Sequence, residues 1–138
     1  MTIEINNLTN FAVDKKVFST VAKKVLKGEN RETEAVSLAF VDKEEIRKVN
    51  KKFRKKNRAT DVLSFLLNEK QCLGEIIICP EVVKENAGKY GVSAKEEMLK
   101  VFVHGILHLC GYDHEKSKKE AEEMEKKQEK YLSHINLK

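Results

Sequence analysis

The chain has 138 residues, which is enough for one folded domain but hardly for two. Charged residues make up 36% of it, and 27 Lys and Arg against 22 Asp and Glu give a net charge of +5. No run approaches the roughly 18 consecutive apolar residues that a membrane span needs, and the first residues lack the basic start and apolar middle of a signal peptide. We therefore expect a single cytoplasmic domain with no membrane partner.

The first third of the chain predicts two strands around a helix. Residues 2–6 form a short first strand, and from about Phe11 to Leu26 apolar residues recur at helical spacing, with Gly28 as a stop. Residues 35–41 alternate in a way that predicts a strand with two fairly apolar faces. The apolar positions of the helix are Phe18, Val21, Ala22, Val25 and Leu26.

A capping box of Asp42 and Glu45 predicts the start of a second helix. Its inward face is predicted to consist of Ile46, Val49 and Phe53. Six basic residues form the end of this helix and the loop beyond it. They are Lys51, Lys52, Arg54, Lys55, Lys56 and Arg58. This basic cluster suits the phosphates of a nucleic acid, but it also suits a solvated helix end, where Lys and Arg are favoured by the helix dipole.

The middle of the chain predicts a hairpin followed by a short helix. Residues 61–67 and 73–79 read as two antiparallel strands joined by a polar turn. Pro80 ends the second strand and opens a helix over residues 81–89, because proline is tolerated in a first helical turn.

A second capping box, Ser93 with Glu96, starts the helix that carries two histidines. His104 and His108 are the only polar side chains between Val101 and Cys110, which predicts a buried central helix. The Glu- and Lys-rich residues 116–132 predict an outer helix. The fold class is therefore α+β: a mixed sheet of about four strands, about five helices, and the histidine helix at the centre.

The histidine spacing indicates a metal site. His104 and His108, four apart, share one face of a helix, and a left-handed Gly111 turns the chain back so that His114 reaches the same point. Three imidazoles with an open fourth position are typical of a catalytic zinc, although nickel, cobalt or copper also suit such ligands. We predict one zinc ion on these three residues.

Two neighbouring features bear on that site. The spacing equals that of the metzincin peptidases, but Gly105 stands where those enzymes carry the glutamate that serves as general base, so a different substrate is expected. Three cysteines, Cys72, Cys79 and Cys110, are predicted to be unpaired, small, buried apolar groups. Cys110 is expected to point away from the histidines.

Three segments together resemble one known family. His104–His114 reads H-G-x-L-H-L-x-G-Y-D-H in general form, which is similar to the signature of the YbeY family of RNA-processing endoribonucleases. The stretch from Phe53 to Phe65 resembles that family's Y-R-x-K-x-x-P-T-D-V-L-S-F segment, and Leu73–Ile76 resembles its L-G-D-I strand. Ala59 and Glu75 depart from the pattern, where the family usually has proline and aspartate.

The resemblance implies that residues 1–138 form a single metal-dependent hydrolase domain. It implies a single-strand-specific endoribonuclease with zinc on the three histidines and a functional arginine at Arg54. It further implies work in ribosomal RNA maturation, at the 3′ end of the small-subunit rRNA, and in ribosome quality control. The implied partners are single-stranded RNA, the small ribosomal subunit with its assembly factors, and an Era-type GTPase.

The chemistry of the residues is compatible with RNA cleavage, because zinc and the Arg54 guanidinium would stabilise negative charge on a phosphate from two sides. The alternative interpretation of Arg54 is a salt bridge with Asp61 or Glu75. A zinc peptidase and a non-catalytic ribosome-assembly factor stabilised by zinc are the alternative functions.

Three further residues have two interpretations each. Asp113 either orients a histidine ligand or caps the helix that starts near Lys116. Glu97 either approaches the site or stabilises the first turn of its helix. Ser64 either lines the cleft or is an ordinary strand hydroxyl.

Overall fold

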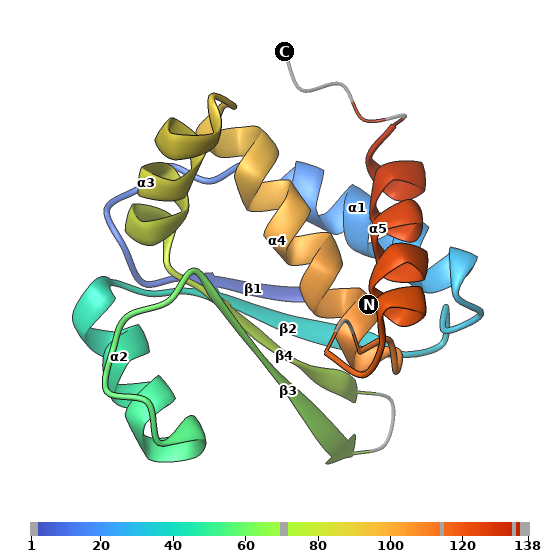
Figure 1. The fold of residues 1–138 in the computed structure, drawn as a ribbon, viewed down its shortest axis with the longest axis horizontal. Helices are drawn as coiled ribbons and strands as arrows, with labels where there is room; N and C mark the ends of the chain where they lie inside the picture. Colours follow the sequence, from blue (N-terminus) through green and yellow to red (C-terminus); the bar gives the residue numbers. More distant parts are fainter. Residues whose placement is uncertain (1–2, 70–71, 114, 134, 136–138) are drawn as a thin grey trace.

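The computed structural model describes residues 3–69, 72–113, 115–133 and 135. This part of the chain forms four strands and five helices, with strands and helices alternating up to β3 and three helices following β4 (Figure 1). The strands are β1 (Ile3–Asn7), β2 (Ala35–Phe40), β3 (Val62–Glu69) and β4 (Cys72–Ile78). The helices are α1 (Lys15–Gly28), α2 (Lys43–Arg54), α3 (Pro80–Tyr90), α4 (Ala94–Leu109) and α5 (Lys118–Leu132). The predicted α+β class is confirmed.

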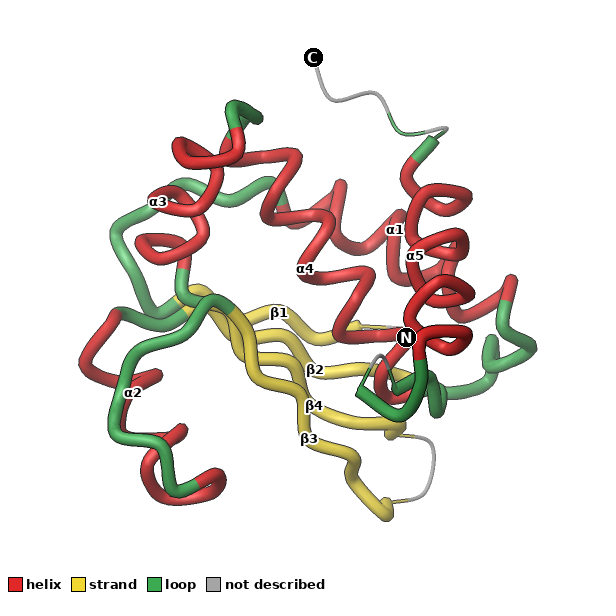
Figure 2. Tube along the Cα trace, in the orientation of Figure 1, coloured by secondary structure: helices red, strands yellow, loops and turns green. Residues whose placement is uncertain are grey.

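The strands form one mixed sheet in the order β1-β2-β4-β3. β1 and β4 run parallel to β2, and β3 pairs antiparallel with β4 as the predicted hairpin. Figure 2 shows α1, α4 and α5 over one face of this sheet and α2 on the other side. The separation follows from the alternation of side chains along a strand: Ile76 joins the core under α4, while Ile77 packs with Ile46 of α2.

The histidine helix is central, as predicted. α4 contacts α1, α3 and α5 as well as β3 and β4. Most of its side chains are buried, among them Leu99, Phe102, Val103, Ile106 and Leu107. Because packing on several sides fixes this helix, the side chains on its remaining face have a defined position.

Helix caps explain where the helices begin. The Asp42 and Ser93 side chains accept hydrogen bonds from the backbone N–H three residues later, which confirms both capping boxes as helix starts. The expected start of α1 at Phe11 is wrong. Asp14 caps this helix by accepting from Val17 N, so the helix begins at Lys15.

Two other expectations need correction. Phe53 is 61% exposed rather than inward-facing, because it lies beside the edge strand β3, where the Phe65 ring contacts it at a centroid distance of 5.5 Å. The inward stripe of α2 instead uses Asn50, whose Nδ2 donates to the Arg58 carbonyl at 3.0 Å. The three cysteines are free, but Cys79 alone of them is fully buried, and Cys72 and Cys110 are half-buried.

Among the described residues, no helix combines the length and apolar composition that a membrane crossing requires.

Candidate active site

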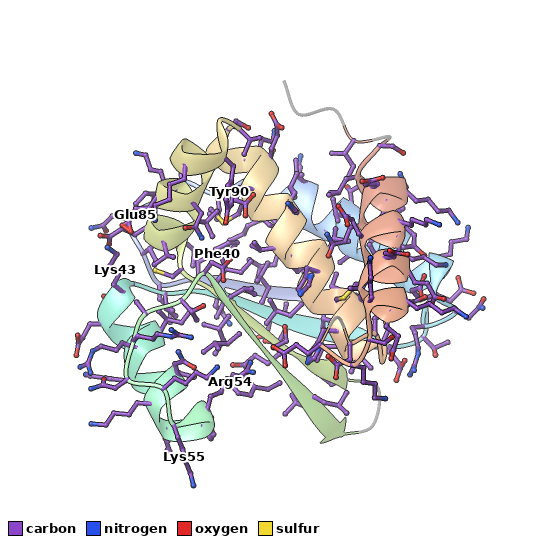
Figure 3. The ribbon with its side chains drawn as sticks, viewed as in Figure 1. Phe40, Lys43, Arg54, Lys55, Glu85 and Tyr90 are labelled. Carbon is purple, nitrogen blue, oxygen red and sulfur yellow. The ribbon has the colours of Figure 1, made fainter. Side chains whose placement is uncertain are left out.

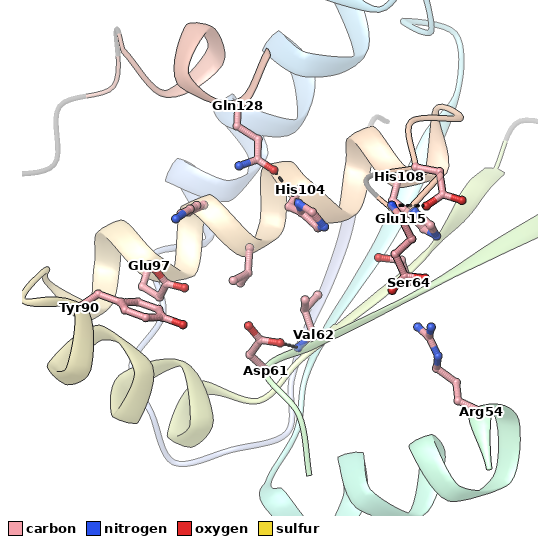
Figure 4. A pocket seen from close by; sticks show the side chains of 13 residues that line it. Arg54, Asp61, Val62, Ser64, Tyr90, Glu97, His104, His108, Glu115 and Gln128 are labelled. Carbon is pink, nitrogen blue, oxygen red and sulfur yellow. Dashed lines mark hydrogen bonds between the residues drawn. The ribbon is translucent and has the colours of Figure 1, made fainter. Parts of the chain in front are cut away.

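A cleft of about 680 Å³ opens along the exposed face of α4, between that helix and the start of β3 (Figure 4). α4, β3, the end of α2 and the segment after α4 all contribute side chains to it. The polar residues that line it are Arg54, Asp61, Ser64, Tyr90, Glu97, Lys100, His104, His108, Asp113, Glu115 and Gln128. The cleft therefore brings together two of the predicted histidine ligands, Arg54 and the three residues with two interpretations each, Ser64, Glu97 and Asp113.

His104 and His108 lie on the cleft face of α4, and each ring is held through its Nδ1 atom. Nδ1 of His104 lies 2.6 Å from Gln128 Oε1, and Nδ1 of His108 lies 3.2 Å from the backbone carbonyl oxygen of Tyr112. A carbonyl oxygen accepts and cannot donate, so both Nδ1 atoms carry a proton and donate it. In the neutral rings the lone pair is then on Nε2, which is the arrangement of a histidine that ligates a metal.

The turn after α4 brings the chain back toward the cleft. α4 ends at Leu109, and Gly111 adopts a φ of +107°, a conformation that side chains other than glycine rarely adopt. Two residues later, Asp113 lines the cleft. The third predicted ligand, His114, lies outside the described residues, and no group of three potential ligands gathers among the described ones. Two imidazoles with their lone pairs on Nε2 fit zinc as a donor set.

Gly105 is explained by packing. A Cβ atom at this position would lie 3.0 Å from Ser64 Oγ and 3.2 Å from Ile76 Cδ1, so a larger side chain would require these two side chains to shift. A glutamate here would meet the sheet. This close contact is a structural reason for the absence of the metzincin base, and it weighs against the peptidase interpretation.

Arg54, the last residue of α2, reaches the cleft wall from the side opposite α4. The expected alternative, a salt bridge to Asp61 or Glu75, is wrong, since among the described residues neither carboxylate pairs with it. Figure 3 shows Arg54 near β3 and Lys55 pointing away from the body of the protein. Within the basic cluster, Arg54 lines the cleft, and the other five residues are exposed and lie outside its lining.

Comparison with known proteins decides the family. The model of the family described as Endoribonuclease YbeY matches residues 4–136. The chain belongs to the YbeY family. Among similar proteins with that name, one from Bdellovibrio bacteriovorus is 48% identical over 102 residues, covering 74% of this chain and 67% of the relative. One from Thermosipho melanesiensis is 38% identical over 123 residues, covering 89% and 88%.

A solved structure agrees with the YbeY assignment. The solution structure of TM1509 from Thermotoga maritima superposes with a TM-score of 0.70 at 38% sequence identity. The match covers 96% of this chain and 87% of that one. The resemblance read from three sequence segments is therefore confirmed over nearly the whole chain.

The structure locates the three residues of this YbeY chain for which the sequence allowed two interpretations. Asp113 lines the cleft, and its Oδ1 accepts from Glu115 N at 2.9 Å. It does not cap α5, because Ser117 does so by accepting from Glu120 N. Ser64 lines the cleft. Glu97 fits both of its interpretations, since it lies in the first turn of α4 and also lines the cleft.

Sequence reasoning missed the residues that hold the histidines in place. Gln128 is buried in α5, twenty-four residues from His104, the ring that it contacts. Glu29, just after α1, accepts hydrogen bonds from the Tyr112 hydroxyl at 2.8 Å and from the Tyr131 hydroxyl. Because the Tyr112 carbonyl holds His108, this carboxylate anchors the turn that orients the second histidine.

The environment of Glu29 is reflected in its pKa. Burial acts to raise the pKa of this carboxyl, but the hydrogen bonds from Tyr131 and Tyr112 and the charge of Lys127 together lower it below its usual value. Burial of the ring and the hydrogen bond to Glu29 raise the pKa of Tyr112 to about 12. Glu29 thus stays ionised and keeps accepting both hydroxyl groups. No local pattern marks it, because its partners lie more than eighty residues away.

Proposed function

We propose that this chain is a single-strand-specific, zinc-dependent endoribonuclease that matures ribosomal RNA, at the 3′ end of the small-subunit rRNA, and serves ribosome quality control. One observation carries the proposal: two histidines with Nδ1 held by oxygen acceptors face a cleft whose opposite wall carries Arg54, which forms no salt bridge with any described residue. The name shared by the relatives, Endoribonuclease YbeY, supplies the reaction class.

His104, His108 and His114 would hold the zinc ion. A bound zinc would lower the pKa of a water molecule toward roughly 7 and stabilise negative charge on a phosphate. The protein's own contribution to that site is orientation. Gln128 and the Tyr112 carbonyl fix the ring rotation and the tautomer, so that the nitrogen facing the cleft is the one able to ligate.

Arg54 supplies the second positive group. Its planar guanidinium stays charged at any physiological pH and donates two parallel hydrogen bonds to phosphate oxygens. A phosphodiester between this side chain and the histidines would have its developing negative charge compensated from both sides. The exposed remainder of the basic cluster, Lys51, Lys52, Lys55, Lys56 and Arg58, would bind phosphates further along the strand.

The partners follow from this role. We propose single-stranded rRNA as substrate, with the small ribosomal subunit, its assembly factors and an Era-type GTPase as the assembly in which the chain acts. A cytoplasmic location belongs to the same proposal.

Cleavage by metal-quantified protein tests the proposal. The protein is incubated with end-labelled single-stranded and duplex RNA, beside His114→Ala and Arg54→Ala variants. We expect the parent to cut the single strand preferentially and both variants to lose at least about a hundredfold in rate, the scale seen when one group that stabilises transition-state charge is removed. Arg47→Ala is the control, because Arg47 lies on α2 like Arg54 but pairs with Glu44 on the exposed surface.

Two outcomes would contradict the proposal. If both variants cut as fast as the parent, the activity comes from a contaminating nuclease. If the parent binds RNA without cutting it and unfolds when zinc is removed, the chain is a zinc-stabilised assembly factor rather than an enzyme.

A further inference from the structure

Glu97 is a buried carboxylate at the far end of the cleft from the histidines (Figure 4). The residue is 5% exposed, and within the described part of the chain no group hydrogen-bonds or ion-pairs with its carboxylate. The side chain lines the cleft wall, and its oxygens are not fully enclosed by protein atoms. A carboxylate that is buried on its other sides and faces a cleft is positioned to accept hydrogen bonds from a bound ligand.

The pKa of Glu97 is consistent with a carboxylate that has few hydrogen-bond donors within the protein. Burial raises the pKa of this carboxyl, the positive charge of Lys100 opposes the rise, and the negative charge of Asp61 adds to it. The positive charge of Lys100 therefore does not fully compensate the negative charge of the buried Glu97 carboxylate.

An aromatic ring stands beside this carboxylate. Tyr90, the last residue of α3, is 64% exposed although its side chain is large and mostly apolar. Both the cleft and a shallower neighbouring hollow of about 240 Å³ are lined by Tyr90, Glu97 and Lys100. Figure 4 shows the ring next to Glu97, with Asp61 across the cleft. An exposed ring beside a polar group is the usual platform for an unstacked base.

The two ends of the cleft suit different parts of a nucleotide. Arg54 and the histidines suit a phosphate, whereas Glu97 and Asp61 would repel one. The carboxylate end accepts hydrogen bonds and offers a stacking surface, so it suits the donor edge of a base. Glu97 lies seven residues before His104, about 10 Å along the helix axis, which places such a base near the bond to be cut.

We propose that Tyr90 and Glu97 form a subsite for an unpaired guanine next to the scissile phosphate, with the base stacked on the Tyr90 ring and its N1–H and N2–H donating to the Glu97 carboxylate. Guanine is chosen because its Watson–Crick edge carries two adjacent donors that match the two oxygens of one carboxylate. Adenine and cytosine present one amino group beside an acceptor, and uracil presents one imino group between two carbonyls. This inference rests on the proposed function.

The test is an NMR titration of metal-loaded, full-length protein with guanosine 5′-monophosphate and inosine 5′-monophosphate. The two nucleotides differ by the exocyclic amino group alone, and neither contains a phosphodiester bond to be cut. We expect the guanine nucleotide to bind roughly tenfold more tightly, the scale for one two-bond base contact, with shifts in the first turns of α4 and at the end of α3. Glu97→Gln should bring the affinity ratio close to one.

Glu125→Gln is the matched control, because it removes one negative charge from the exposed surface of α5, outside the cleft. It should keep the guanine preference, whatever it does to overall affinity. Tyr90→Leu, at an exposed position that leaves the core intact, should weaken both nucleotides by at least about fivefold through lost stacking.

Equal affinity of the parent for both nucleotides, or an unchanged ratio in Glu97→Gln, would overturn the subsite. RNA cleavage measured on the same preparations separates the two proposals. Cleavage without a Glu97-dependent guanine preference refutes the subsite alone, and a Glu97-dependent preference without cleavage refutes the proposed endoribonuclease alone.

Discussion

Gly28→Ala tests the packing of Tyr131, whose hydroxyl donates to Glu29, the carboxylate that also holds Tyr112 in the turn after the histidine helix. A Cβ atom at Gly28 would lie 2.3 Å from the Tyr131 hydroxyl oxygen and 2.5 Å from its Cε1. Tyr131 is 3% exposed, so its ring cannot move into solvent, and its hydroxyl donates to Glu29. Alanine at this position must therefore displace the ring and break that hydrogen bond.

The expected cost follows from these contacts. Forcing an extra carbon into a packed site costs about 1–3 kcal/mol, and losing a hydrogen bond to a charged group costs about 1.5–3 kcal/mol. The better helix propensity of alanine returns up to about 1 kcal/mol. We expect a net destabilisation of about 2–5 kcal/mol, which for a chain of this length lowers Tm by at least about 6 °C.

Gly88→Ala is the matched control, because no atom lies within 4 Å of a Cβ at that position in α3. It should gain about 0.5–1 kcal/mol from helix propensity. Both variants are compared with the parent by thermal and urea unfolding. If Gly28→Ala is as stable as the parent, or gains stability as Gly88→Ala does, the packing of Tyr131 and its hydrogen bond to Glu29 do not stabilise the fold as described.

Three further results are expected. Gln128→Leu removes the acceptor of His104 Nδ1, so we expect zinc affinity to fall by roughly 10- to 100-fold, measured by competition with a chelator. An unchanged affinity would mean that Gln128 does not orient the ring. Because the pKa of Glu97 is raised in the folded state, its ionisation costs stability as pH rises above its ordinary value of 4.5. Glu97→Gln should therefore be more stable than the parent at pH 7 and no more stable at pH 4, as measured by urea unfolding at both pH values. The pKa of Glu29 is lowered instead, so Glu29→Gln should be less stable than the parent at pH 7, and this deficit should shrink as pH falls below 4.5; a deficit independent of pH would contradict the assignment.

Local patterns predicted the helices, the hairpin and the histidine face of α4 because each depends on residues close in sequence. The capping side chains of Asp42 and Ser93 mark helix starts within three residues, and the alternation in 35–41 marks a strand. The error at Phe53 has a different origin. Helical periodicity places the ring on the inward side of α2, but the sheet ends at β3 and offers little to cover it.

The supporting residues of the site escaped prediction because their partners are distant in sequence. Gln128 reads as one more polar residue of an outer helix until α5 packs against α4. The sequence allowed Glu97 either to approach the site or to stabilise the first turn of its helix, and its burial depends on packing around the cleft between α4 and the start of β3. The close packing of Gly105 against Ser64 could not be predicted either, because it depends on how near α4 lies to β3.

The most direct test of the metal site is the zinc content of the purified protein, measured by elemental analysis after gentle preparation without chelators. We expect about one zinc ion per chain in the parent, as for a site with three histidine ligands, and almost none in a variant with alanine at His104, His108 and His114 that remains folded by circular dichroism. A parent that is always free of metal, or a folded triple variant that keeps the full zinc content, would contradict the site on which the proposed chemistry depends.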